Sequence, residues 1–315
     1  MEVQGIAVVK RTTPSSKLWQ DVKRGFPLYL MITPGLLFFI LFKYLPMGGI
    51  IIAFKQYDPF VGFMDSPWVG FDHFVKLFTE PDFFILLRNT MLVSLFNLIF
   101  FFPAPVVLAL LLHEVKVRWF RKTMQTIVYM PHFFSWVVVV GITVLLFATQ
   151  SGGINNLLAS LGLERVELLT NPDYFRSVYV FQNIWKEAGW NAIIFLAALA
   201  AVDPTLYEAA RVDGAGRWRQ MWSINVPALK STIIILFILR LGSVLEVGFE
   251  HIYLMQNSIN IGVSDVFDSY VYRNGVLQGA FSYTTAVGLF KSLVGLVLVI
   301  GANRLSKKLG EEGVY

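Results

Sequence analysis

Long apolar stretches separated by short polar segments run through most of this chain of 315 residues. Six stretches are long enough to cross a hydrocarbon core of about 30 Å, which takes about 20 helical residues. They lie near residues 26–52, 88–112, 122–148, 178–201, 229–249 and 280–302. Runs of this length lack the two-residue alternation of barrel strands, and lipid offers no partners to open backbone groups. The pattern predicts an all-α integral membrane protein with six transmembrane helices.

Composition agrees with a membrane protein. Hydrophobic residues make up 56% of the chain and charged residues 15%, well away from the balance of soluble domains. The net charge of +5 comes from basic residues that flank the apolar stretches, so nucleic-acid binding is not needed to explain it. Cysteine is absent, which excludes disulfide and thiolate chemistry. No cleavage site of small residues follows the first apolar stretch, so we expect this span to be retained.

The distribution of Lys and Arg predicts an orientation in the membrane. If both termini face the cytoplasm, the inner segments hold sixteen of these residues and the outer segments six. The outer six are Lys55, Lys76, Arg88, Arg165, Arg176 and Arg273. The positive-inside rule therefore predicts cytoplasmic tails over residues 1–25 and 304–315, around a transmembrane domain of residues 26–303. The N-terminal tail fits either an interfacial helix, with Leu18, Trp19, Val22 and Phe26 on one side, or a disordered basic tail.

Residues 203–227 form a loop whose polar part, residues 207–227, lies between two long apolar runs, and this orientation places the loop in the cytoplasm. Asp203 and Pro204 are typical of a helix start, and Gly214 permits a sharp bend. Pro227 is expected to begin the fifth span. Such a short helix is marginal alone in water, so we expect it to pack on a partner.

The spacing within this loop carries a family resemblance. Its matching residues are Glu208, Ala209, Ala210, Asp213, Gly214, Ile224 and Pro227. In register, they resemble the EAA loop of the membrane subunits of ABC importers, with Val226 where the family usually has Leu. The alternative is an ordinary Ala-rich connecting loop, which Glu-Ala-Ala alone would favour.

The resemblance extends outside the loop and covers about residues 26–310. Ile184-Trp185, Ala188-Gly189-Trp190 and residues 193–199 resemble carbohydrate-uptake permeases of the MalF/MalG type, as do segments of residues 125–136. The Tyr44–Gly48 and Phe54–Tyr57 segments are most similar to the branch that imports acidic or complex oligosaccharides, such as alginate-type permeases. The implied fold is that of a type I ABC importer permease (MetI-like), with a cytoplasmic coupling helix.

The resemblance also implies partners and a location. These are a homologous second permease subunit in a heterodimer, two ATP-binding subunits, an extracytoplasmic solute-binding protein and an oligosaccharide, at the bacterial plasma membrane. The helix around Glu208 would sit in a groove of the ATPase. The chain has no phosphate-binding G-x-x-x-x-G-K-[ST] loop, so ATP and magnesium are expected on the partner, with no cofactor here. No nucleophile, base and orienting group can be proposed together, so we do not expect an enzyme.

Polar residues inside the spans are candidates for the transport pathway, because charges at the bilayer centre are costly. The candidates are Asn183, Lys186, Glu187, Trp190, Asn191, Arg240 and Lys291. Amide and aromatic groups suit a sugar, and the cations would suit an anionic one. The alternative is that some of them form interhelical ion pairs, such as Arg240 with Glu187 or Lys291 with Glu246.

A second hypothesis is a secondary transporter driven by an ion gradient, with Glu187, Glu246 and Lys291 as a relay. Paired broken helices, which are typical of such transporters, are not expected from the six apolar stretches. The four histidines, His73, His113, His132 and His251, are too scattered for a metal site and are expected to be interfacial or packing residues.

Overall fold

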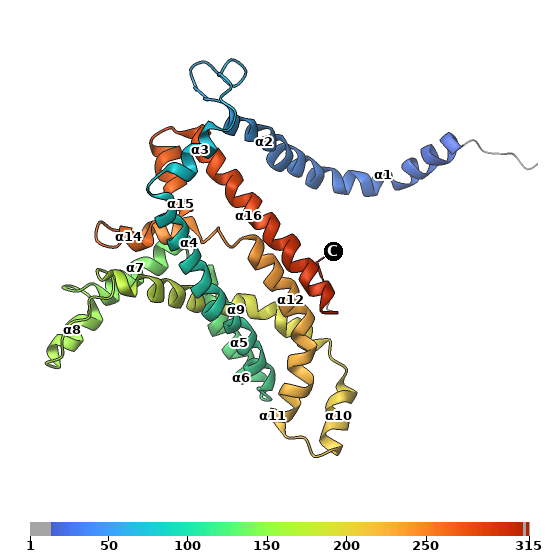
Figure 1. Ribbon diagram of the computed structural model, residues 1–315. Helices are drawn as coiled ribbons and strands as arrows, with labels where there is room; N and C mark the ends of the chain where they lie inside the picture. Colours follow the sequence, from blue (N-terminus) through green and yellow to red (C-terminus); the bar gives the residue numbers. More distant parts are fainter. Residues whose placement is uncertain (1–13, 311–312, 315) are drawn as a thin grey trace, which may run out of the picture. The chain divides into compact units, whose positions relative to one another are not determined.

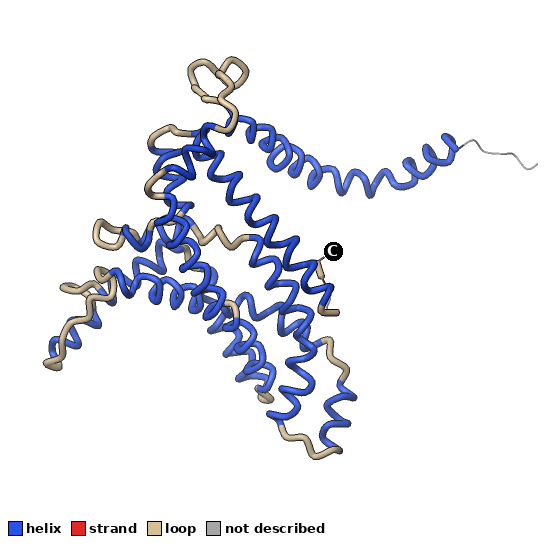
Figure 2. The backbone as a smooth tube through the Cα atoms, viewed as in Figure 1, coloured by secondary structure: helices blue, strands red, loops and turns tan. Residues whose placement is uncertain are grey.

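The computed structural model describes residues 14–310 and 313–314, and it is built almost entirely of helices (Figures 1 and 2). The α-helices are α1 (Pro14–Phe39), α2 (Leu45–Met47), α3 (Asp72–Thr79), α4 (Phe83–Phe96), α5 (Pro103–Glu114), α6 (Arg118–Tyr129), α7 (Trp136–Phe147), α8 (Gly153–Ser160), α9 (Phe175–Ala200), α10 (Pro204–Val212), α11 (Arg217–Gln220), α12 (Val226–Gly242), α13 (Phe249–Met255), α14 (Ile261–Ser264), α15 (Phe267–Val271) and α16 (Phe281–Lys308). Within the described residues no strand forms, and Lys55 and Trp68 make one isolated bridge. The fold is all-α, as the apolar pattern predicts.

The chain divides into two units, residues 1–52 and 53–315. The first contains α1, a π-helical turn (Ile40–Tyr44) and α2, and none of its residues from Gly25 to Ile52 is buried within the unit. Residues 14–25 are helical and continuous with the first apolar stretch. The rest of the predicted N-terminal tail, residues 1–13, lies outside the described residues.

The second unit has three clusters of buried apolar side chains. One joins α3, α4, α15 and α16 around Leu86 and Phe267. The next joins α4, α9 and α13 around Val93 and Ile252. The third joins α5, α9 and α12 around Phe195. Because α9 contributes to two clusters, it connects the end of the unit that carries α14 and α15 to the end that carries α10 and α11 (Figure 1).

Four helical stretches among the described residues are long and apolar enough to cross a membrane. They are Gly25–Phe54, Phe83–Glu114, Arg217–Gly242 and Phe281–Lys308. Two bent pairs bring the number to six if each is one span: Arg118–Phe133 with Trp136–Phe147, and Pro172–Ala200 with Pro204–Val212. The structure thus contains four to six candidate spans, which includes the predicted number.

Two sequence predictions about the spans are wrong in detail. The third span, expected as one helix over residues 122–148, bends by 100° next to Ser135, so a broken helix is present after all. The fifth span was expected near residues 229–249, after Pro227, but the helix that carries it runs from Arg217 to Gly242 and so ends seven residues earlier. A π-helical segment, Met221–Asn225, precedes the proline. Pro227 has no N–H to donate, so a locally widened helix accommodates it without a break.

Candidate coupling segment and membrane pathway

The predicted cytoplasmic helix is α10, and its start is fixed by local contacts. The side chain of Asp203 accepts a 2.9 Å hydrogen bond from the backbone N–H of Thr205, and Pro204 occupies the first helical position. The hydrogen bonds from Thr205 hold the pKa of the Asp203 carboxyl below its ordinary value, because they stabilise the carboxylate. This is the N-cap that the sequence predicts.

The end of α10 is a tight reversal at Gly214. The backbone N–H of Ala215 donates to the carbonyl of Ala210 at 2.8 Å, and Gly214 has a φ of 75°. These are the features of a Schellman-type helix end, in which glycine takes the left-handed conformation at least cost. The chain then turns into α11, so residues 203–227 form a helix, a bend and a second helix.

A side-chain contact ties α10 to the start of α12. The hydroxyl group of Tyr207 donates to Oδ1 of Asn225 at 2.6 Å, and Asn225 is fully buried. The ring of Tyr207 also lies 6.2 Å from the ring of His113 near the end of α5. The helix is therefore attached to two membrane helices.

Among the described residues, no other part of the chain buries the rest of α10. None of its residues is buried, and Glu208 and Ala209 are exposed. Leu206 is 52% exposed and Val212 is 88% exposed. Of the other predicted coupling residues, Asp213, Gly214 and Pro227 are exposed, whereas Ala210 and Ile224 are half-buried. A helix this short and this uncovered fits the expectation of a docked partner.

In the membrane, the structure brings Lys186 and Glu187 of α9 together with His132. Nζ of Lys186 donates to Oε1 of Glu187 at 2.5 Å and to the carbonyl of His132 at 3.0 Å. Nδ1 of His132 lies 2.7 Å from Oε2 of Glu187, and its ring stacks on Trp190 with 4.4 Å between ring centres. Glu187 therefore pairs within this cluster rather than with Arg240, and the ion pair expected there is wrong.

Asn183 and Asn191 lie along the same helix but make different contacts. Nδ2 of Asn183 is 3.4 Å from Oδ1 of the buried Asn97, between α4 and α5. Nδ2 of Asn191 donates to the carbonyl of Glu187 at 2.9 Å, and the side chain lines a cavity. Asn183 and Asn191 thus belong to two neighbouring polar regions, not to one binding cluster.

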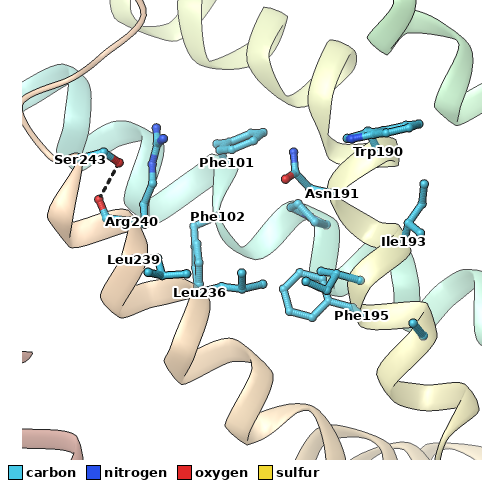
Figure 3. A pocket seen from close by; sticks show the side chains of 13 residues that line it. Phe101, Phe102, Trp190, Asn191, Ile193, Phe195, Leu236, Leu239, Arg240 and Ser243 are labelled. Atoms are coloured by element: carbon cyan, nitrogen blue, oxygen red, sulfur yellow. Dashed lines mark hydrogen bonds between the residues drawn. The ribbon is translucent and has the colours of Figure 1, made fainter. Parts of the chain in front are cut away.

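That cavity, of about 700 Å³, lies between α5, α9 and α12 (Figure 3). Its walls include Phe101, Phe102, Trp190, Asn191 and Arg240. Among the described residues, no carboxylate lies within 4.0 Å of the Arg240 guanidinium. Of the charged pathway candidates, Arg240 is the one that faces a cavity without an ion-pair partner in the described part of the chain.

Lys291 of α16 is paired, but not with Glu246 as expected. Its ammonium group contacts the Asp268 carboxylate of α15, and the other oxygen of that carboxylate accepts a 3.1 Å bond from the N–H of Val247. The lysine therefore helps to hold the segment that follows α12 onto α16. This contact makes it a structural residue rather than a lining residue of the cavity.

Comparisons with known proteins agree with this architecture. Residues 102–311 match the family described as binding-protein-dependent transport system inner membrane component. The chain belongs to this family. The permease is similar to the polygalacturonan/rhamnogalacturonan transport system permease protein YteP of Bacillus subtilis (strain 168), with 56% identity over 91% of this chain and 90% of the relative. It is also similar to the protein LplB of the same organism, with 55% identity over 93% of this chain and 92% of the relative.

The solved structures include a chain of a bacterial alginate ABC transporter in complex with an alginate pentasaccharide-bound periplasmic protein. It matches with a TM-score of 0.85 and 43% identity, over 95% of this chain and 100% of that chain. These similarities confirm the ABC importer permease fold and an inner-membrane transport component that works within a transporter complex. They also favour the permease over a secondary transporter or an enzyme.

Sequence reasoning missed several residues of the permease that the structure makes important. His132 was expected to be an interfacial or packing residue, and no role was predicted for Asn97. Each meets its partner over a long distance in the sequence: His132 and Glu187 are 55 residues apart, and Asn97 and Asn183 are 86 apart. The polar face on α9 was visible, but nothing in the sequence named the residues that face it.

Proposed function

We propose that the permease is one of two membrane subunits of an ATP-driven importer of acidic oligosaccharides, and that residues 203–227 couple it to a separate ATPase. In this proposal both termini are cytoplasmic and the permease domain spans residues 26–303. A homologous second permease, two ATP-binding subunits and an extracytoplasmic solute-binding protein complete the transporter. Transport proceeds by alternating access.

The attachment of α10 is the observation that carries the coupling. The helix leaves Glu208 and Ala209 exposed while Tyr207 holds it to Asn225 at the base of α12. A partner bound to the exposed face of α10 would therefore move α12 as well, because the hydrogen bond and the short connection keep the two helices together. The exposed Leu206 and Val212 add apolar area for such a partner to cover.

The charge of the substrate is inferred from the cavity and from the relatives. Polygalacturonan is a polymer of a uronic acid, and one matching structure belongs to an importer of the acidic polysaccharide alginate. Arg240 supplies a guanidinium that can bind a carboxylate through two parallel hydrogen bonds. Trp190, Phe101 and Asn191 supply the ring faces and amide groups that suit a sugar.

Charge reversal at Glu208 tests the coupling. In the complete transporter reconstituted in proteoliposomes, Glu208→Lys should abolish ATP-dependent uptake and reduce co-purification with the ATPase, with membrane insertion unchanged. Glu167→Lys is the matched control, because Glu167 is also exposed and lies in a loop at the far end of α9. Normal uptake by the Glu208→Lys variant would refute the coupling role.

Substitution of Arg240 tests the substrate. Arg240→Gln should weaken transport of uronate oligosaccharides at least fivefold and leave transport of the same chains with reduced carboxyl groups unchanged. Equal effects on both sugars would contradict an acidic substrate bound at Arg240. A wild-type transporter that carries only the neutral chains would refute the acidic substrate itself.

A further inference from the structure

Two arginines converge on one amide at the end of the second unit that carries α14 and α15. Nε and Nη2 of Arg88, on α4, lie 3.4 and 3.2 Å from Oδ1 of Asn89. Nη2 of Arg176, on α9, lies 3.5 Å from the same oxygen. Nη2 of Arg88 also reaches the carbonyl of Gly262 at 3.3 Å. These are long contacts for charged donors, which prefer about 2.7–2.9 Å to a carboxylate.

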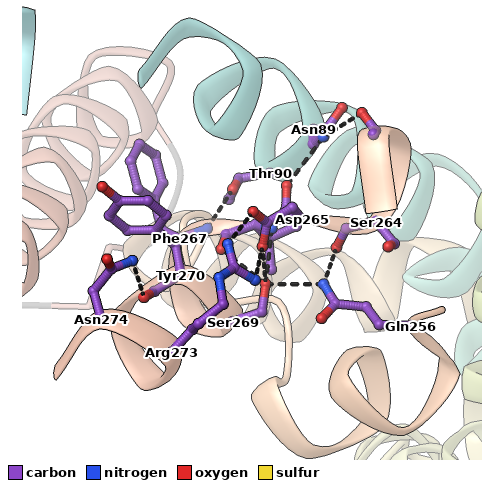
Figure 4. Close-up of polar contacts among 12 residues, drawn as sticks. Asn89, Thr90, Gln256, Ser264, Asp265, Phe267, Ser269, Tyr270, Arg273 and Asn274 are labelled. Carbon is purple, nitrogen blue, oxygen red and sulfur yellow. Dashed lines mark hydrogen bonds and ion pairs between the residues drawn. The ribbon is translucent and has the colours of Figure 1, made fainter. Parts of the chain in front are cut away.

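Asn89 holds its oxygen toward the arginines because its other end is fixed. Its Nδ2 donates to the carbonyls of Gly262 and Asp265, each at 3.0 Å (Figure 4). The side chain is fully buried. The amide therefore acts as a fixed anchor, and the two guanidinium groups share an uncharged acceptor.

The two positive charges are not balanced locally. In the described part of the chain, no carboxylate lies within 4.0 Å of Arg88 or Arg176, and Asp173 acts on Arg176 only from farther away. Nε of Arg176 is buried without a hydrogen-bond acceptor. Arg273 shows the contrast, since it makes two bonds to the carboxylate of Asp265, the shorter at 2.5 Å. Arg88 and Arg176 together keep donor capacity that a carboxylate would use.

The position of Arg176 connects this pair to the proposed pathway. Arg176, Asn183 and Trp190 are spaced by seven residues on α9, so they share a face, with about 10.5 Å of helical rise between successive members. The first two contact α4 or the turn that follows it, through Asn89 and Asn97. Trp190 lines the cavity that contains Arg240. A row of polar contacts thus runs from the arginine pair toward that cavity.

We propose that Arg88 and Arg176 form an outer site for a carboxylate group of the transported oligosaccharide, at the start of the route to Arg240. The inference rests on the proposed acidic substrate and on the proposed orientation. A uronate bound there replaces a shared amide oxygen with a charged acceptor for both guanidinium groups. The two positive charges would attract an acidic oligosaccharide toward the α9 face. A neutral oligosaccharide would gain nothing over the water molecules that it displaces from the guanidinium groups.

Transport kinetics test the site in the complete reconstituted transporter with its solute-binding protein. The variants are Arg88→Gln, Arg176→Gln and Arg176→Lys, assayed with a uronate oligosaccharide and with the same chain after reduction of its carboxyl groups. Each Gln variant should raise the KM for the acidic chain five- to tenfold and leave the KM for the reduced chain unchanged. Arg176→Lys should recover part of the affinity because it keeps the charge. Arg165→Gln is the matched control, since Arg165 is exposed and bonds to the carbonyls of Thr149 and Gln150 beside its own loop.

Three other results would contradict the proposal. An equal rise in KM for both chains, with weaker binding of the solute-binding protein to the permease, would assign the arginines to protein docking and overturn the proposal. Wild-type kinetics in both Gln variants would overturn it while leaving the proposed function intact. If the wild-type transporter does not transport the acidic chain, both this proposal and the proposed function are refuted. If Arg176→Gln fails to insert in the membrane, the exposed Arg88 carries the test alone.

Discussion

The hydroxyl group of Tyr207 donates a 2.6 Å hydrogen bond to Oδ1 of Asn225, and this bond joins α10 to the base of α12. Tyr207→Phe removes the donor and leaves the fully buried Asn225 short of a partner, at a cost of about 1–3 kcal/mol. We expect the ATPase subunits still to co-purify, because the exposed face of α10 is unchanged. The ratio of oligosaccharide uptake to ATP hydrolysis, both measured in the same proteoliposomes, should fall severalfold.

The control for this experiment is Tyr174→Phe, since Tyr174 is exposed and lies at the other end of α9. A Tyr207→Phe variant with wild-type coupling would show that the link between α10 and α12 does not depend on this bond.

Gly214 and Gly216 provide a matched pair for testing the shape of the coupling segment. Both are exposed, and a Cβ atom on either would meet no heavy atom within 4 Å. They differ in backbone conformation: Gly214 has a φ of 75°, whereas Gly216 has a φ of −69°. A side chain in the left-handed conformation costs roughly 1–2 kcal/mol, and β-branching adds to this cost. Gly214→Val should therefore reduce ATP-dependent uptake and ATPase co-purification, whereas Gly216→Val should change both much less.

Equal loss in the two variants would contradict the backbone argument and point instead to a partner that touches both positions. Purified amounts of each variant, compared by size-exclusion chromatography, separate a coupling defect from misfolding.

The ion pair between Lys291 and Asp268 predicts strongly non-additive effects on stability. Both side chains are largely buried, so Lys291→Met leaves the Asp268 carboxylate without its counter-ion and should destabilise the fold by about 3–5 kcal/mol. The double variant with Asp268→Asn removes both charges and should recover most of this loss, because an amide oxygen can still accept from the N–H of Val247. Thermal unfolding in detergent measures both. Additive losses would mean that the two charges are not coupled.

The sequence predicted best what depends on neighbouring residues. The cap at Asp203 and the bend at Gly214 follow from local backbone chemistry, and the structure has both. The helix of the fifth span begins ten residues before Pro227, because a π-helical turn, Met221–Asn225, carries the helix up to the proline.

Partners distant in the sequence could not be predicted at all. Glu246 was the example given for an ion-pair partner of Lys291, but the fold brings Asp268 to the lysine from a short helix in the intervening segment. Likewise, the bend next to Ser135 places His132 beside Glu187. Which carboxylate meets which cation depends on how helices bend and pack, and hydropathy alone does not contain this information.

The contact between α12 and α16 allows a last prediction from the backbone. A Cβ atom on Gly295 would lie 2.2 Å from the carbonyl oxygen of Gly242, which is far inside van der Waals contact and involves backbone that cannot rotate away. Gly295→Ala should therefore push the two helices apart and lower the thermal unfolding temperature in detergent, with reduced transport. Gly301→Ala is the control on the same helix, because a Cβ there meets nothing within 4 Å. Alanine has a higher helix propensity than glycine, by about 1 kcal/mol, so Gly301→Ala should leave stability unchanged or raise it. A stabilised Gly295→Ala variant would show that α12 and α16 are not packed this closely in the membrane.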